Sequence, residues 1–178
     1  MGARLVTCPA MIVIGIDPGT LHLGWGVLRS EGNRVTHLGH GVIDAPASQN
    51  LARRLVLIDG ALERIIEHYR PDVGSVESLF FHKDAQSAAK LGHARGVVLL
   101  SLARAGLEVV EYPPARVKST VAGHGRADKS QVVKMMQRLL SLDVAPRTDA
   151  ADALALAFTY VRRAPLERAL AARSALAR

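Results

Sequence analysis

The stretch that decides the fold is MIVIGIDPGT, residues 11–20. A short, continuous apolar run that ends at an acid and a Pro-Gly pair is typical of a buried strand closed by a turn. Asp17 is the last residue of this strand, so its carboxylate is expected at the carboxyl edge of a sheet, where open α/β sheets usually hold their sites. An Asp before Pro-Gly also commonly begins a turn, which leaves both interpretations open at this position.

The patterns on either side of this strand predict an α/β fold. Two further strands flank EGN, residues 31–33, in which Gly32 and Asn33 can take positive φ as a hairpin requires. Apolar spacing and proline stops then predict helices and strands in alternation. The predicted strands are 11–17, 23–30, 34–43, 72–78 and 106–112, and the predicted helices are 49–69, 84–104, 129–140 and 149–161. The result is a five-stranded mixed sheet flanked by helices, with three antiparallel strands followed by two strands joined through helices.

The chain of 178 residues is long enough for one sizeable core and too short for two ordinary domains. We expect a single domain over 11–161, a disordered extension at 1–10 and a basic tail at 162–178. No apolar run approaches the ~20 residues of a spanning helix, and the N-terminus lacks the apolar core of a secretory signal. The expected location is the cytoplasm, away from membranes, and the single Cys8 fits a reducing compartment.

The formal net charge of +7 favours a polyanionic partner, and the basic residues are concentrated in two segments. Residues 162–178 hold five Arg and one Glu, which is compatible with a solvated face or a frayed helix. Residues 116–138 hold six Lys or Arg and one Asp, and they include two glycines. This second segment, the basic strip, lies just before an unusual acidic helix.

That helix begins in RTDAADALALAF, residues 147–158, where apolar side chains cover almost every face. Asp149 and Asp152 are three apart and therefore neighbours on one side of the helix. Helix capping explains one acid better than two, because a helix that is apolar all round should be buried and a buried acid needs a partner. Glu77 also ends an apolar strand, and it would share a cleft with Asp17 if the two strands were adjacent; otherwise it is an edge residue in water.

Four clustered carboxylates would repel one another, and two Mg²⁺ or Mn²⁺ ions would relieve that repulsion. Two such ions about 4 Å apart can activate a water and stabilise the leaving oxygen of a phosphodiester. Zinc would require regularly spaced His or Cys. The only hint of a pair is His37-x-x-His40, which falls on a predicted strand where that spacing has little meaning.

Four motifs together resemble the RuvC family of bacterial Holliday-junction resolvases, in the same order and over residues 11–161. They are IGIDPGTLHLGWGVL, SVESLFFHKDAQSAAKLGHARG, YPPARVKSTVAGHGRADKSQV and TDAADALALA. The resemblance implies a ribonuclease H-like fold, a homodimer, and metal-dependent nicking of two like strands of a four-way DNA junction that leaves 5′-phosphate and 3′-hydroxyl ends. It also implies that Asp17, Glu77, Asp149 and Asp152 are both catalytic and metal-binding.

The same resemblance places DNA-handling lysines at Lys118 and Lys129 and an aromatic contact at Phe80, with Phe81 beside it. Ordinary solubility next to a helix is the alternative for either lysine, and core packing is the alternative for one phenylalanine. An exposed aromatic beside a catalytic acid could stack on an unpaired base. The basic strip adds two further candidates for DNA binding, Arg116 and Arg126.

Two symmetric cuts in a two-fold substrate suit an isologous homodimer, because one chain supplies a single acidic cluster. Helix 84–104, rich in small residues, is the candidate interface, and the family's branch-migration motor is an expected partner. Three alternatives are a ribosomal-RNA-processing nuclease of the same fold, an actin-like ATPase and a non-catalytic junction-binding protein. The length and second motif argue against the first, and the single domain argues against the second.

Overall fold

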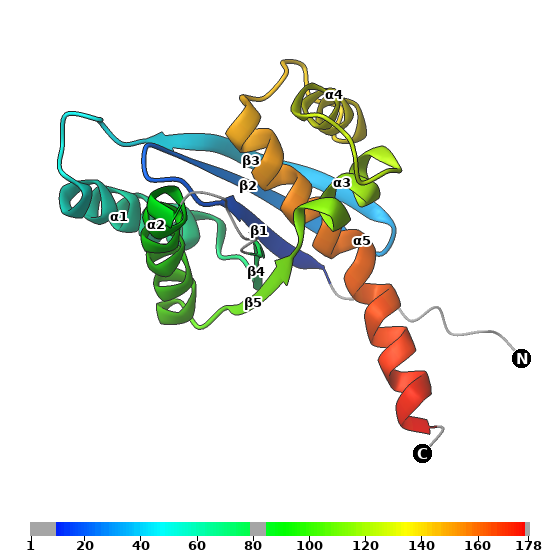
Figure 1. Ribbon diagram of the computed structural model, residues 1–178. Coiled ribbons are helices and arrows are strands. Elements are labelled where there is room, and N and C mark those ends of the chain that lie inside the picture. The colour runs from blue at the N-terminus through cyan, green and yellow to red at the C-terminus, as the bar shows by residue number, and fades with distance from the viewer. Residues whose placement is uncertain (1–9, 79–84, 177–178) are drawn as a thin grey trace, which may run out of the picture.

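In the computed structural model, which describes residues 10–78 and 85–176, five strands form one sheet and five helices cover its two faces (Figure 1). The strands are β1 (Met11–Asp17), β2 (His22–Glu31), β3 (Arg34–Asp44), β4 (Val73–Glu77) and β5 (Glu108–Tyr112). The helices are α1 (Leu51–Tyr69), α2 (Ala85–Arg104), α3 (Pro114–Ala122), α4 (Lys129–Leu139) and α5 (Thr148–Leu176).

The strand order is β3-β2-β1-β4-β5, which confirms the predicted mixed sheet. β1, β2 and β3 pair antiparallel, whereas β4 pairs parallel with β1 and β5 pairs parallel with β4. The hairpin between β2 and β3 turns at Gly32, whose φ is +59°, while Asn33 does not take the positive φ that was open to it. β1 is therefore a central strand covered on both faces, which explains its continuous apolar sequence.

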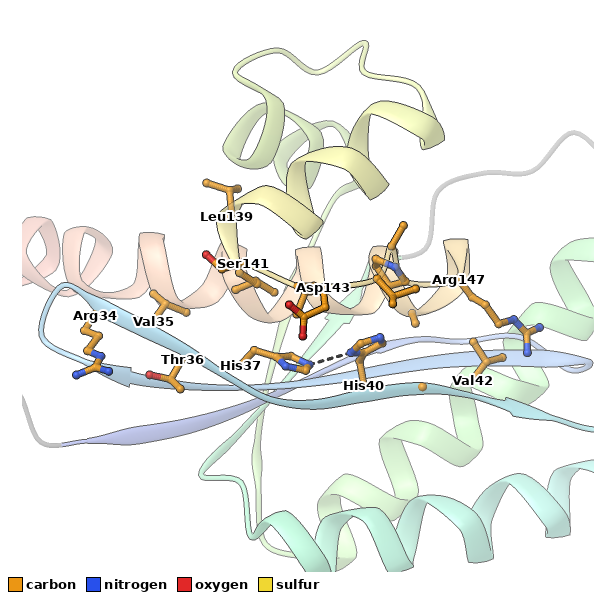
Figure 2. A pocket seen from close by; sticks show the side chains of 17 residues that line it. Arg34, Val35, Thr36, His37, His40, Val42, Leu139, Ser141, Asp143 and Arg147 are labelled. Atoms are coloured by element: carbon orange, nitrogen blue, oxygen red, sulfur yellow. Dashed lines mark hydrogen bonds between the residues drawn. The ribbon is translucent and has the colours of Figure 1, made fainter.

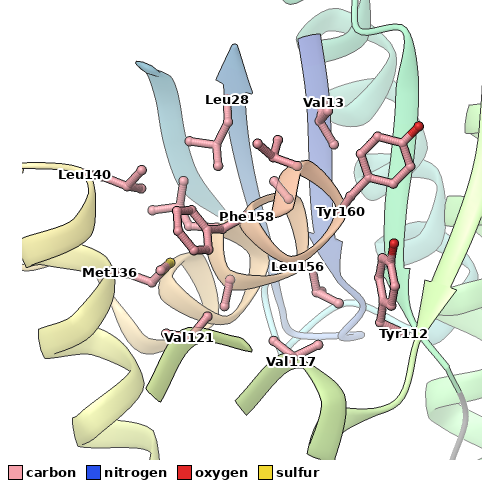
Figure 3. Packing of buried hydrophobic residues seen from close by; sticks show 14 of the residues in the cluster. Val13, Leu28, Tyr112, Val117, Val121, Met136, Leu140, Leu156, Phe158 and Tyr160 are labelled. Carbon is pink, nitrogen blue, oxygen red and sulfur yellow. The ribbon is translucent and has the colours of Figure 1, made fainter. Parts of the chain in front are cut away.

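Strand alternation divides the core of β1 between two helical layers. Val13 packs with the cluster formed by α3, α4 and α5, around Leu156, Phe158 and Met136 (Figure 3). Ile14 and Ile16 point the other way, into the cluster that α1 and α2 complete. The α5 face of β1 thus carries residues 13, 15 and 17, so the fold directs Asp17 towards α5.

α5 lies against the sheet with its backbone close to two glycines. A Cβ on Gly15 would meet the Ala153 carbonyl oxygen at 2.0 Å, and one on Gly24 would meet the Asp149 carbonyl oxygen at 1.9 Å. The buried Ser75 hydroxyl of β4 also donates a hydrogen bond of 2.9 Å to the Leu156 carbonyl oxygen. These contacts fix both the depth of α5 on the sheet and its position along the strands.

The structure differs from the predicted helices in two places. The sequence pattern predicts only a strand stop at the prolines after β5, but Pro114 is in the first turn of an additional helix, α3, where a missing N–H costs nothing. The last helix was predicted to end at Val161, but α5 continues through Pro165 to Leu176. Of the described side chains in α5, Ala164 is the last one that is buried. No helix in the described ranges is long and apolar enough to cross a membrane.

Gly15→Ala should prevent the close packing of α5 on the sheet. The added methyl group would meet backbone atoms that cannot rotate away, so we expect the free energy of unfolding to fall by about 3 kcal/mol or more. Gly60→Ala in α1 is the control, because its new Cβ would meet only the Arg64 side chain at 3.7 Å. That variant should be neutral or more stable by roughly 0.5–1 kcal/mol. Urea denaturation of both variants measures the difference, and equal stability would contradict the backbone contact.

Candidate active site

Asp17 and Glu77 lie at the ends of two adjacent parallel strands. The register pairs Ile16 with Val76, so the next residue on each strand carries an acid at the same edge of the sheet. Side chains alternate between the two faces of a strand, and in β4 Val73 and Ser75 both contact the α5 layer. Glu77, two residues after Ser75, therefore points to the same face. The strands that carry Asp17 and Glu77 are therefore adjacent, as a shared cleft requires.

The second pair of acids comes from the start of α5. The helix begins at Thr148, which puts Asp149 in its first turn and Asp152 one turn further along, on the stripe that leads to Leu156. A cavity of about 200 Å³ opens between this stripe, the strand ends and the two preceding helices. Its lining residues are Asp17, Glu77, Pro114, Val117, Lys118, Lys129, Val132, Asp152 and Leu156.

Burial and neighbouring charges raise the pKa of two acids in this region, Asp17 and Asp152. Burial, together with the charges of Asp152, Glu77 and Asp149, raises the pKa of Asp17 from its ordinary value of 3.8 to about 8, against the opposing charge of Lys129. Burial also raises the pKa of Asp152, opposed mainly by Lys129. Asp149 therefore acts on the cluster through its charge, although it is not among the residues that line the cavity.

Both predicted lysines lie beside the acids. Lys129 Nζ is 3.5 Å from Asp152 Oδ2, and Lys118 reaches the same cavity from α3. Arg116 and Arg126 are exposed, but neither lines this cavity. Phe80 and Phe81 lie outside the described residues.

An ion-pair cluster that sequence reasoning missed holds the start of α5 to the sheet. Arg147 donates two hydrogen bonds to the Asp44 carboxylate, at 2.6 and 3.0 Å, and His22 Nδ1 lies 2.6 Å from the same carboxylate. The hydrogen bonds from Arg147 and His22 lower the pKa of Asp44 to about 2. Asp44 and Arg147 are 103 residues apart, and no periodic pattern links them, so only the fold shows that they are partners.

A larger cavity of about 840 Å³ lies between β3 and the loop that joins α4 to α5 (Figure 2). It contains His37 and His40, whose ring nitrogens are 2.8 Å apart. A β-bulge near Leu38 breaks the alternation of β3, which is why two residues three apart share a face. The histidines are thus a pair despite their strand position. However, across the described parts of the chain, no three His, Cys, Asp or Glu side chains already lie at metal-ligand spacing.

Comparison with known proteins identifies the family. The sequence family described as crossover junction endodeoxyribonuclease RuvC matches residues 13–160. The chain belongs to the RuvC family. A RuvC protein of Sorangium cellulosum is 58% identical over 93% of this chain and 92% of its own length, and a RuvC protein of Rubrobacter xylanophilus is 45% identical over 84% of each chain. Nucleases of the RuvC family generally depend on divalent metal ions.

Solved structures agree with the fold. RuvC of Thermus thermophilus, in complex with a Holliday junction substrate, is 36% identical and superposes with a TM-score of 0.82, covering 88% of this chain and 96% of that one. The yeast mitochondrial Holliday junction resolvase Ydc2, at 14% identity and a TM-score of 0.60, shares the fold. The predicted ribonuclease H-like fold is confirmed.

The acids fit the metal that this family requires. All four are oxygen donors, the ligands that hard divalent cations prefer. Burial, and after it the charges of the neighbouring carboxylates, raises the pKa of Asp17 and so disfavours its charged form, whereas a bound cation would favour that form. The cluster therefore offers the oxygen donors that a divalent cation prefers and raised pKa values that a cation would lower, although the described acids do not already stand at metal-ligand spacing.

Asp17→Asn should stabilise the metal-free protein at alkaline pH. In wild type the folded state keeps a proton that the unfolded state releases above about pH 4, so the free energy of unfolding falls as pH rises towards about 8. The variant lacks this titration and should be more stable at pH 8.5 by at least about 1 kcal/mol. Urea denaturation at pH 5, 7 and 8.5 in EDTA measures the slope.

The control for this measurement is Asp143→Asn, an exposed acid on the loop before α5. It should leave the pH slope unchanged. Added Mg²⁺ should raise the melting temperature of wild type and of Asp143→Asn more than that of Asp17→Asn. An unaltered slope in Asp17→Asn would remove this residue from the acidic cluster.

Proposed function

We propose that this chain is an endodeoxyribonuclease that resolves four-way DNA junctions by paired, symmetric nicks of two like strands. The observation that carries the proposal is the single cavity where Asp17, Glu77 and Asp152 face Lys118 and Lys129. Acids can hold metal ions, and lysines beside them can bind a phosphate backbone. Membership of the RuvC family supplies the substrate class, since a relative of 36% identity is bound to a Holliday junction.

Asp17, Glu77, Asp149 and Asp152 would hold two Mg²⁺ or Mn²⁺ ions. When bound, such ions supply an activated water and charge stabilisation for phosphodiester hydrolysis, which would leave 5′-phosphate and 3′-hydroxyl ends. The chain itself contributes a rigid arrangement of the four acids. Asp17 and Glu77 are fixed by paired strands, and Asp149 and Asp152 are fixed by a helix that packs directly on those strands.

Lys118 and Lys129 would bind the phosphates on either side of the cut. Their ammonium groups enter the acid cavity from α3 and from the first turn of α4, so a backbone bound between them would pass over the acids. The Asp128 side chain caps α4 by accepting from the Gln131 N–H at 2.9 Å, which fixes the turn that carries Lys129. Arg116 and Arg126, exposed nearby, would extend the DNA contact, and Phe80 or Phe81 would contact a base at the junction centre.

Resolution by two symmetric nicks requires two acidic clusters, so the acting form would be a homodimer. The outer side of α2 is the proposed interface: Gly96 is exposed, and Leu100 keeps 47% of its surface exposed in the single chain. The cytoplasm, where chromosomal junctions form in bacteria, would be the place of action. A branch-migration motor of the kind that serves this family would be the protein partner.

Asp149→Asn should abolish cutting while binding survives. The substitution replaces a charged carboxylate of the cluster with a neutral amide, which is a weaker metal ligand. We expect the cleavage rate to fall at least about 100-fold, which corresponds to an activation barrier higher by about 2.7 kcal/mol. Purified protein is incubated with a labelled four-way junction, a linear duplex and a structured RNA, with and without Mg²⁺ or Mn²⁺. Symmetric nicks in the junction alone support the proposal.

The other outcomes distinguish the alternatives. Cleavage of RNA alone would identify a ribosomal-RNA-processing nuclease, and binding without any cleavage would identify a junction-binding protein. Full activity of Asp149→Asn would contradict the assignment of that acid. Ligation of the nicked products tests the predicted 5′-phosphate and 3′-hydroxyl ends.

Lys118→Ala should weaken junction binding and cleavage most at low salt, and the difference from wild type should shrink as salt rises. Each phosphate contact that is lost should make the slope of log association constant against log salt less negative by roughly 0.9. Lys134→Ala is the matched control, because Lys134 is an exposed lysine of α4 that does not line the cavity. Equal salt dependence in the two variants would argue against a direct phosphate contact by Lys118.

A further inference from the structure

Arg95 is a buried charge next to the active site. It belongs to α2, and only 6% of its surface is exposed. Burying a guanidinium group is costly unless its charge and its N–H donors are satisfied. The neighbours of Arg95 should therefore explain its presence in the core.

Both partners of Arg95 lie at the carboxyl edge of the parallel strands. Its Nη1 donates a hydrogen bond to the backbone carbonyl oxygen of Glu77, and its Nη2 lies 2.6 Å from Glu111 Oε1. The planar guanidinium fork thus joins α2 to the ends of both β4 and β5. Ser78, the next residue of the chain, donates from its N–H to the Tyr112 carbonyl oxygen at 2.9 Å.

Arg95 acts on Glu77 from the side opposite the acids. Glu111 follows Val110, which packs with the α5 layer, so alternation places Glu111 on the α1 and α2 side of the sheet. The Glu77 side chain shares the cavity with Asp17 and Asp152 on the α5 side. Arg95 therefore contacts the backbone of the acid without being among the residues that line its cavity.

We infer that Arg95 is a positioning residue for Glu77, held in place by Glu111, and that it couples the position of α2 to the geometry of the acid cluster. The inference rests on the proposed role of Glu77 as a metal ligand. The carbonyl of Glu77 is the last backbone group of β4, so its direction sets where the carboxylate stands relative to Asp17. A shift of α2 would be transmitted to the catalytic acid through one side chain.

Arg95→Gln is the primary test, with Arg104→Gln as its matched control. Both variants remove one positive charge from α2, but Arg104 is 65% exposed and meets Asp59 only at 3.5 Å. We measure single-turnover cleavage of a four-way junction against Mg²⁺ concentration, junction affinity without divalent ions, and thermal melting. Arg95→Gln should lower the cleavage rate by about 10–100-fold and raise the Mg²⁺ concentration needed for half the maximal rate. Its junction affinity should change by less than about twofold, and Arg104→Gln should match wild type.

Two further variants keep the test decisive if Arg95→Gln does not fold. Glu111→Gln changes a side chain that is 45% exposed, keeps an acceptor for Arg95 and removes the charge, so it should show the same changes to a smaller degree. Arg95→Lys retains the charge but lacks the fork that reaches both partners, and it should restore only part of the rate.

Two results would overturn the inference. One is that folded Arg95→Gln or Glu111→Gln cleaves at the wild-type rate with the wild-type Mg²⁺ dependence. The other is that these variants lose thermal stability while the Mg²⁺ dependence stays unchanged, which would make Arg95 structural only. Failure of wild type itself to cut the junction would instead refute the proposed function.

Discussion

The direct contact between the backbone of α5 and the sheet is the constraint on which the site depends. Gly15 and Gly24 leave no side chain between the layers, so the Ala153 and Asp149 carbonyl groups approach the strands as closely as backbone atoms can. Interposed side chains would hold a helix further from the sheet and allow it to slide. Here α5 has one depth and one register, and its two acids are placed against the strand ends with the accuracy of main-chain packing.

The close packing of α5 on the sheet holds together a cluster of acids that is electrostatically unfavourable by itself. Half-buried carboxylates with raised pKa values oppose folding at neutral pH, and the apolar cluster around α5 offsets the cost. The bidentate ion pair between Arg147 and Asp44 also joins the start of α5 to the end of β3. Lys129 reduces the repulsion without removing it, because its own side chain is 70% exposed and screened by water.

Much of this arrangement follows from local rules of sequence. An apolar run that ends in an acid places Asp17 and Glu77 at strand ends, and helical spacing puts Asp149 and Asp152 on one side of a helix. Their convergence depends on which strands are neighbours, and the order of the motifs in a known family supplied that information. Helix α3 was missed because a proline pair both ends a strand and begins a helix. Arg95 and Arg147 were missed because their partners are remote in sequence and only topology brings them together.

The two faces of the sheet carry different kinds of side chain. Acids and lysines gather on the α5 face, whereas α2, on the other face, presents exposed small and apolar residues. Glu77 belongs to both layers, since its side chain enters the acid cavity and its carbonyl accepts from Arg95 of α2. In the proposed homodimer, α2 would contact the partner subunit and also the backbone of Glu77, so each acid cluster would be sensitive to the pairing of the two subunits. Arg95, a buried charge that is costly as a structural element, directly connects α2 with the end of the strand that carries Glu77.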